Sequence, residues 1–207
     1  GMAQIYREVP TIAPGFSSTH WRFYQADAAE GTAIAGSGVD AANIVVARGS
    51  KLRQRWNAKR NGSLDTQHFL TECNLNGGAF STIDNSCASR PVCIAADSVK
   101  NMGDATTDLL PNDGFIFTPG RFVVDTLNTG LQTTVPDGGD TEWETGYAFN
   151  QSLANNDVVR CRLRTGAGDF GVNGYPAVLP EIVINVPTGL AGGASMSGGT
   201  SQGGRRQ

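Results

Sequence analysis

Hydrophobic and polar residues alternate along several short segments of this chain. The clearest alternation lies in 157–164, where Val159, Cys161 and Leu163 fall on one side of an extended backbone. Successive side chains of a β-strand point to opposite faces, so this pattern predicts a strand with one apolar face and one charged face. The charged face consists of Arg160, Arg162 and Arg164.

Other segments show the same short-range pattern, with turn residues between them. The turn 111–114 has a physical basis, because Pro111 fixes φ and Gly114 permits a positive φ. Residues 98–110 could hold a short helix, although Gly103 and two threonines disfavour it, and residues 26–40 could be a loop or a short helix. Together these segments predict an all-β fold, a compact β-barrel or β-sandwich of short antiparallel strands. The predicted strands besides 157–164 are 43–47, 48–60, 68–75, 79–83, 92–96, 115–117, 121–125, 146–149 and 178–186.

The two ends of the chain differ in composition from its middle. Residues 1–24 contain prolines that block a helix, and we expect an extended arm. Residues 187–207 are rich in Gly and Ser, and we expect a flexible tail. This leaves 25–186 as the β-rich domain. An aromatic cluster near the end of the arm could anchor it on its own core or on a neighbouring subunit: Trp21, Phe23 and Tyr24.

Composition supports a β-protein and narrows the range of partners. The 207 residues include 27 glycines, and only 17% of them are charged, with a formal net charge of -3. That balance is too mild to indicate a nucleic-acid partner. No apolar run approaches the roughly 18–20 residues that a membrane-spanning helix needs. No signal peptide pattern opens the sequence, so we expect synthesis in the cytoplasm without export.

The four cysteines follow no metal-binding or redox spacing. They are Cys73, Cys87, Cys93 and Cys161. Cys93 and Cys161 lie in apolar segments and are expected to act as small buried hydrophobic residues. Our first expectation is therefore free, reduced thiols. A bridge from Cys73 to Cys87 that closes a hairpin is the main alternative, and metal ligation is a further one.

Residues that could carry out chemistry do not form a recognisable motif. His20 and His68 are far apart and have no metal-ligand spacing. The acidic loop 137–142 could bind Ca²⁺, but it lacks the ligand order of an EF-hand. Glu142 and Glu144 alternate along one strand, which is typical of a polar face rather than of a glycosidase pair. We expect neither an enzyme nor a cofactor nor a metal site.

Two charged features remain as candidates for binding. One is the arginine stripe of 160, 162 and 164, which could bind carboxylates or be a solvated face paired with Asp125, Glu142 and Glu144. The other is the basic segment 48–60, which contains no acidic residue. Nucleic acid is a minor alternative as its ligand. The basic residues of this segment are Arg48, Lys51, Arg53, Arg55, Lys59 and Arg60.

Part of the chain resembles the head-decoration proteins of tailed bacteriophages. The resemblance covers about 91–164 and begins with Pro-Val-Cys-Ile-Ala-Ala at 91–96. It continues with Gly-Arg-Phe-Val-Val-Asp at 120–125 and Gly-Tyr-Ala-Phe at 146–149. It ends with Asn-Asp-Val-Val-Arg-Cys-Arg-Leu at 156–163. This chain differs from that family in its length, in the basic segment and in the Gly/Ser tail.

The resemblance implies a structural virion protein that cements capsid subunits without chemistry. It also implies a homo-oligomer, with a trimer favoured. A viral jelly-roll coat protein that builds the shell itself is one alternative. A carbohydrate-binding β-sandwich is another, and it requires exposed tryptophans as a stacking platform. The candidates for that platform are Trp21, Trp56 and Trp143.

Overall fold

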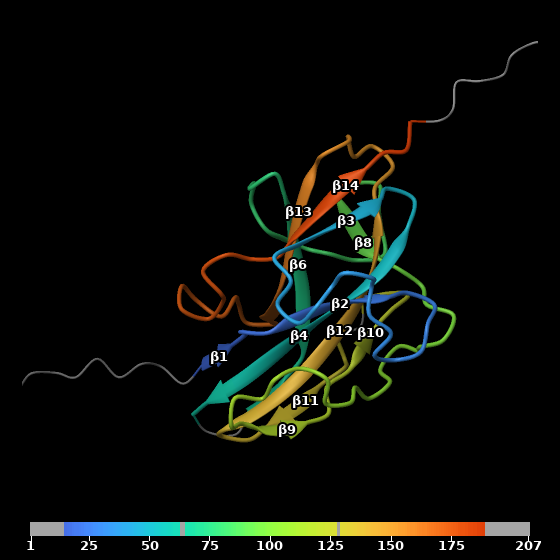
Figure 1. Cartoon of the computed structure of the whole chain (residues 1–207). Helices are drawn as coiled ribbons and strands as arrows, with labels where there is room; N and C mark the ends of the chain where they lie inside the picture. The colour runs from blue at the N-terminus through green and yellow to red at the C-terminus, as the bar shows by residue number, and fades with distance from the viewer. Residues whose placement is uncertain (1–14, 63–64, 128, 189–207) are drawn as a thin grey trace, which may run out of the picture.

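The structure is a computed structural model, and it describes residues 15–62, 65–127 and 129–188. These residues form strands, turns and loops with no helix, which confirms the predicted all-β fold (Figure 1). Among them there is accordingly no helix long and apolar enough to span a bilayer. Two larger sheets share one apolar core, and a two-stranded sheet formed by β5 (Asp65–Gln67) and β11 (Thr133–Val135) lies beside them.

The seven-stranded sheet is built around two long antiparallel strands, β4 (Lys51–Asn61) and β12 (Gly139–Phe149). Their register runs from Lys59 opposite Asp140 to Lys51 opposite Ala148. Two short strands pair with the free side of β4, and three pair with the free side of β12. These strands are β1 (Gly15–Ser17) and β2 (Trp21–Gln25) on β4, and β8 (Val92–Ile94), β9 (Ile116–Thr118) and β10 (Phe122–Val123) on β12.

The five-stranded sheet has the order β3-β14-β13-β6-β7. Its centre is β13, which pairs antiparallel with β6 over seven residues. The outer strand β3 runs parallel to β14, and β9 and β10 run parallel to β12, so both larger sheets are mixed. The bounds are β3 (Asn43–Ala47), β6 (Phe69–Leu75), β7 (Ser81–Thr82), β13 (Val158–Thr165) and β14 (Glu181–Asn185).

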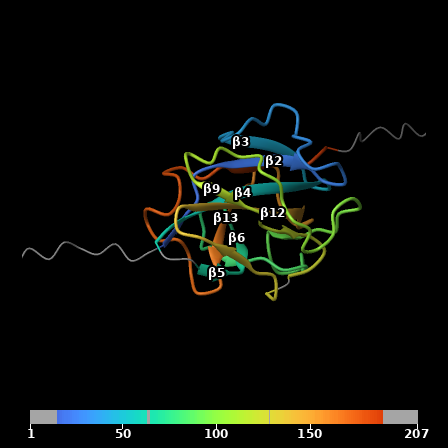
Figure 2. The same cartoon turned by 90° about the horizontal axis from the view of Figure 1, so that it is seen from below.

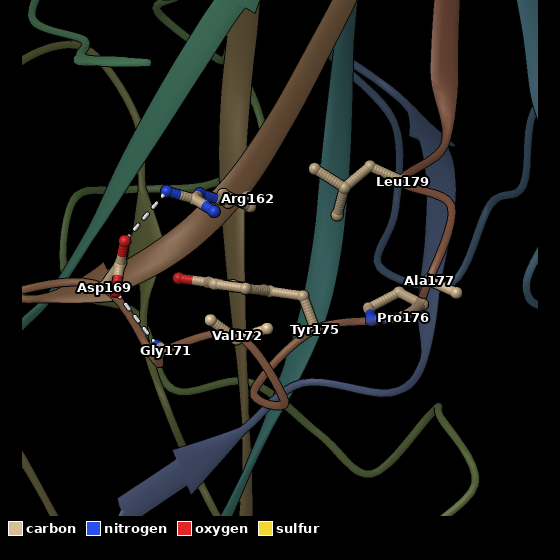
Figure 3. Close-up of a pocket in the computed structure, with 8 residues that line it drawn as sticks. All are labelled: Arg162, Asp169, Gly171, Val172, Tyr175, Pro176, Ala177 and Leu179. Atoms are coloured by element: carbon tan, nitrogen blue, oxygen red, sulfur yellow. Dashed lines mark hydrogen bonds and ion pairs between the residues drawn. The ribbon is translucent and has the colours of Figure 1, made fainter. Parts of the chain in front are cut away.

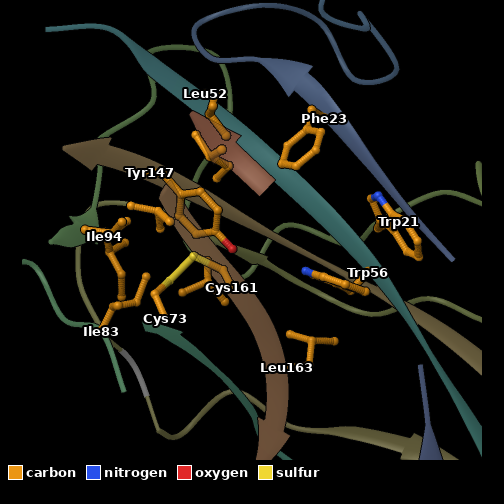
Figure 4. Close-up of a cluster of buried hydrophobic side chains, with 14 of the residues drawn as sticks. Trp21, Phe23, Leu52, Trp56, Cys73, Ile83, Ile94, Tyr147, Cys161 and Leu163 are labelled. Atoms are coloured by element: carbon orange, nitrogen blue, oxygen red, sulfur yellow. A yellow bond between two sulfur atoms is a disulfide. The ribbon is translucent and has the colours of Figure 1, made fainter. Parts of the chain in front are cut away.

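The inner faces of the two sheets meet in a core of large side chains (Figure 4). Trp56 and Tyr147 reach it from the seven-stranded sheet, and Cys161 and Leu163 reach it from β13. Each of these side chains is at most 1% exposed. The apolar face predicted for 157–164 is therefore the core face, and burying it supplies the main driving force for packing the sheets.

Local predictions were correct where they rested on turn chemistry. Gly114 has a φ of 86°, as predicted for the turn at 111–114, and Asp113 also has a positive φ, of 50°. The short helix that 98–110 could hold does not form. The backbone N–H groups of Leu109 and Leu110 instead donate to the Glu142 carboxylate at 2.9 and 2.7 Å, which holds this segment flat against the sheet.

The domain begins earlier in the chain than predicted. Strands β1 and β2 place residues from Gly15 onward inside the seven-stranded sheet, so 15–24 are not an arm. Their aromatic side chains supply the reason, because Phe16 and Trp21 join the core. The rest of the predicted arm, 1–14, and 189–207 of the predicted tail lie outside the described residues.

Candidate interaction surface

The basic segment 48–60 forms most of β4, and its central arginines are not on the surface. Trp56 points into the core, so Arg53 and Arg55 point to the opposite face of the sheet. Both arginines are nevertheless 0% exposed. Loops cover this second face, because both side chains contact loop carbonyls. The expectation of an exposed basic patch is therefore wrong for Arg53 and Arg55.

Acidic partners neutralise these two arginines inside the protein. Arg55 donates to Glu142 at 2.9 Å, to Glu144 at 2.5 Å and to Glu30 at 2.6 Å. It also donates a hydrogen bond to the Thr107 carbonyl, at 2.7 Å. The adjacent strand β12 thus supplies two carboxylates, and the 26–31 loop supplies a third.

Arg53 occupies the next outward position on β4 and shares one of these partners. Its guanidinium lies 3.0 Å from the Glu144 carboxylate and 3.7 Å from that of Asp97. It also donates to the carbonyls of Ala28 and Ala29 at 3.0 and 3.2 Å. We call the set Arg53, Arg55, Glu30, Glu142 and Glu144 the interior charge network.

Hydrogen bonds and neighbouring charges favour the ionised forms of Glu30 and Arg55 in the interior charge network. Burial would raise the pKa of Glu30, but hydrogen bonds from Arg55 and Thr107 outweigh it and lower that pKa to about 2. Burial would likewise lower the pKa of Arg55, but Glu144, Glu30 and Glu142 raise it above its usual range. The arginine therefore stays charged despite full burial, as a paired buried ion can.

The ends of the basic segment are also occupied by internal partners. Lys59 is almost fully buried and contacts Asp113 and the Thr19 hydroxyl. Arg48 donates to the Leu153 carbonyl at 2.8 Å, and Lys51 lies 2.8 Å from Asp27. The last residue of the set, Arg60, is buried with its guanidinium above the Phe16 ring and 3.7 Å from Asp65. No continuous basic surface results within the described part of the segment, which removes the basis for the nucleic-acid hypothesis.

Asp140 lies on the same outer face of the seven-stranded sheet as Arg55, opposite Lys59 in the pairing of β12 with β4. It is completely buried, and burial raises the pKa of its carboxyl to about 7, even though the charge of Lys59 acts to lower it. Asp140 and Glu142 belong to a buried strand rather than to the exposed loop that calcium would need. Within the described part of the chain, no three side chains of His, Cys, Asp or Glu form a metal-binding group.

The aromatic residues proposed as contacts lie in the core. Trp21 is 7% exposed, and Phe23 and Tyr24 are nearly fully buried in β2. The alternative in which this cluster packs on the protein's own core is therefore confirmed, and contact with a neighbouring subunit through it is wrong for the folded chain. Trp56 and Trp143 are each 1% exposed, so the three tryptophans provide no platform on which a sugar could stack.

The cysteines form two disulfides, so the expectation of free thiols is wrong. Cys73 on β6 bonds to Cys161, directly opposite it on β13, and Cys87 bonds to Cys93. The alternative bridge between Cys73 and Cys87 is wrong as well. The sequence spacing could not identify the pair that is 88 residues apart, because only strand register brings it together.

The arginine stripe of β13 lies on the outer face of the five-stranded sheet and is partly exposed. Arg160 contacts Glu181 at 2.5 Å, and Arg162 contacts Glu72 at 2.6 Å. Arg164 lies 3.6 Å from the same Glu72 carboxylate. The stripe is thus paired with acids of neighbouring strands, as one hypothesis held. The acids named in that hypothesis, Asp125, Glu142 and Glu144, are not its partners.

A hollow of about 350 Å³ opens beside Arg162 (Figure 3). The Arg162 guanidinium lies over the rings of Phe80 and Tyr175, 4.1 and 4.5 Å from their centroids, and contacts Asp169 at 3.2 Å. The wall of the hollow is mainly apolar. Besides Arg162 and Asp169, it consists of Gly171, Val172, Tyr175, Pro176, Ala177 and Leu179.

The loop that builds this hollow is held firmly and still presents apolar side chains to solvent. The Tyr175 hydroxyl donates to the Leu163 carbonyl at 2.5 Å, and its ring stacks on Phe170 at 5.2 Å. Val172 and Val178 are nevertheless 99% and 71% exposed. We call Arg162, Tyr175, Val172 and Val178 the loop patch.

The alternating pattern identified Arg162 but not the rest of the loop patch. The residues 175–179, Tyr-Pro-Ala-Val-Leu, form an apolar run, and the strand predicted over 178–186 includes its end. Strand β14 begins only at Glu181, so this run is a loop. An apolar run that contains a proline and stands outside a strand is the signal that could have identified this surface.

Comparisons with known proteins give no further information about identity. No protein-family model, no curated protein and no solved structure matches this chain. Function is therefore inferred from the geometry of the chain itself.

Proposed function

We propose that this protein is a structural virion protein that binds capsid subunits through the loop patch. The observation that carries the proposal is the full exposure of Val172 on a loop fixed by Tyr175. Large apolar side chains that are exposed on a firmly held loop are typical of protein-binding sites. Because the loop is already ordered, docking costs little conformational entropy.

Two further features support a docking role on a particle surface. The charges of the interior charge network are paired with one another inside the fold. The partly exposed arginine stripe on β13 can therefore contribute polar contacts at the rim of the docking surface. Disulfides such as Cys73–Cys161 persist in oxidising surroundings, including virion surfaces. The mixed pairing of both larger sheets makes a shell-forming jelly roll, which is antiparallel, a weaker alternative.

Co-sedimentation with empty capsid shells tests this function. The double variant Val172→Asp, Val178→Asp should lose binding by at least about tenfold, because it places charges in the apolar contact. Val99→Asp is the matched control, since Val99 is 49% exposed on a different loop. The proposal fails if the native chain does not sediment with shells, or if the double variant binds as well as the control.

A further inference from the structure

Strand β3 forms an open edge of the five-stranded sheet, with β14 as its neighbour on one side (Figure 1). Figure 2 shows β3 toward the outside of the fold. At the two ends of β3, the Ala42 carbonyl accepts a hydrogen bond from the Glu181 backbone N–H, and the Arg48 backbone N–H donates one to the Asn185 carbonyl, each at 2.9 Å. Alternate residues of a strand direct their backbone groups to opposite sides, so Val45 directs its N–H and C=O away from β14. Among the described residues, no backbone hydrogen bond uses these two groups.

The composition of β3 favours pairing with another strand. Its sequence is Asn-Ile-Val-Val-Ala, with no charge and no proline, and the Val45 side chain is 67% exposed. Proteins usually protect open edges with lysine, proline, bulges or very short strands. The opposite edge of the same sheet follows this rule, because β7 has only two residues, Ser81–Thr82. In this sheet the unprotected edge is therefore confined to β3.

A shallow apolar groove adjoins this edge. Its volume is about 380 Å³, and Val45, Val46 and Ala47 form one side of it. Ile34 and Leu52 form part of the other side. A strand added at β3 would thus find side-chain contacts as well as backbone partners, as in other cases of strand addition.

The charges around β3 favour a second copy that runs in the opposite direction. Asp40 precedes the strand, and Arg48, which donates to the uncharged Leu153 carbonyl, follows it. Lys51 also follows it, but its charge is already paired with Asp27. An antiparallel partner of the same sequence brings the acidic end of each strand to the basic end of the other. A parallel partner would bring like charges together, which is unfavourable. The edge is therefore complementary to itself in the antiparallel sense.

We propose that two copies of this chain associate through β3, antiparallel, with Val45 facing Val45 across a twofold axis. The pairing joins the two five-stranded sheets into one continuous sheet. It gives a dimer rather than the trimer implied by the phage resemblance. This association does not depend on capsid docking, since β3 is separate from the loop patch and self-association is measured with the purified chain alone.

Sedimentation velocity over a range of protein concentrations tests the proposal. The native chain should show a monomer–dimer equilibrium. Val45→Lys and Val45→Glu should each weaken it by about tenfold or more, because like charges then face one another. An equimolar mixture of the two variants should restore the dimer, since the introduced lysine of one copy then faces the introduced glutamate of the other. Val178→Lys, a substitution of an equally exposed valine elsewhere, should leave the dimer intact.

A backbone variant tests the hydrogen bonds separately from the side chain. Val45→Pro removes the outward N–H donor and spares the ladder to β14, which uses the alternate residues. It should fold, as circular dichroism will show, and sediment as a monomer. The proposal is overturned if the native chain is a monomer at every concentration, or if Val45→Lys still forms dimers. It is also overturned if the lysine and glutamate variants fail to dimerise when mixed.

Discussion

Two strands of this protein alternate arginine with apolar residues in the same way, and they end in opposite environments. In β4, Arg53 and Arg55 are 0% exposed, whereas in β13 Arg160 and Arg164 have side chains that are each 28% exposed. Both strands turn their apolar residues to the shared core. The difference lies on the polar side, where loops cover β4 and leave β13 partly open.

The difference between β4 and β13 shows that a strand pattern predicts which side chains share a face but not whether that face is exposed to solvent. Period-two alternation specifies which side chains share a face. Whether that face meets water depends on segments far away in the sequence, such as the loop that carries Glu30 and the segment 106–110. The cost of a buried charge then depends on its partners, which β12 supplies as Glu142 and Glu144.

The largest expected effect is on stability when an interior arginine is removed. Arg55→Ala should cost about 3–5 kcal/mol, because it leaves buried carboxylates without a counter-charge. Arg160→Ala should cost about 0–1 kcal/mol, because its pair with Glu181 is partly exposed. Urea denaturation of both variants measures the difference. Similar losses of unfolding free energy in the two variants would show that the two arginine faces do not differ. If Arg55→Ala does not fold, Arg55→Lys supplies a milder substitution for the same comparison.

A smaller effect should come from Asp140 and appear as a pH dependence. Its pKa is about 7 in the folded protein, against an ordinary value of 3.8. Between these values the unfolded chain has lost the proton that the folded chain keeps, so stability falls as pH rises from about 4 to 7 and then levels off. Asp140→Asn should remove a change of about 2–4 kcal/mol over this range. Unfolding curves at pH 5 and pH 8 measure it, and an unchanged pH profile would contradict the assignment.

Glu30 should show the opposite sign in a lower pH range. Its pKa is lowered to about 2 from 4.5, so the stability that it contributes is present at neutral pH and is lost as pH falls from 4.5 toward 2. Glu30→Gln should cost about 2 kcal/mol at pH 7 and little at pH 2. Glu181→Gln, on the exposed stripe, should cost about 0–1 kcal/mol at pH 7. Equal costs for the two substitutions at pH 7 would contradict the difference between the covered face of β4 and the partly exposed face of β13.

Much of the fold could be predicted from local patterns, and the candidate site could not. Alternation located the strands around Val159 and Trp56, and the turn at 111–114 followed from Pro and Gly chemistry. The segment around Gly120, which packs on β12, has no local sequence pattern that predicts this contact. It packs so closely that a Cβ at Gly120 would lie 2.0 Å from the Glu142 carbonyl oxygen.

The pairing of distant segments explains the remaining errors. The Cys73–Cys161 disulfide depends on strand register, and the parallel contact of β3 with β14 joins segments from opposite ends of the domain. The alternating pattern singled out Arg162 for its place in the stripe. Its partners Phe80 and Tyr175 come from two separate loops, which no periodic pattern connects to it.

Arginine-selective dicarbonyl labelling, read by mass spectrometry, tests the central contrast most directly. In the native protein Arg160 and Arg164 should be labelled, while Arg53 and Arg55 should remain unmodified because loops exclude the reagent. In urea all four should react. Labelling of Arg53 and Arg55 in the native state at the rate of Arg160 would contradict the account, because the charged face of β4 would then be open to solvent.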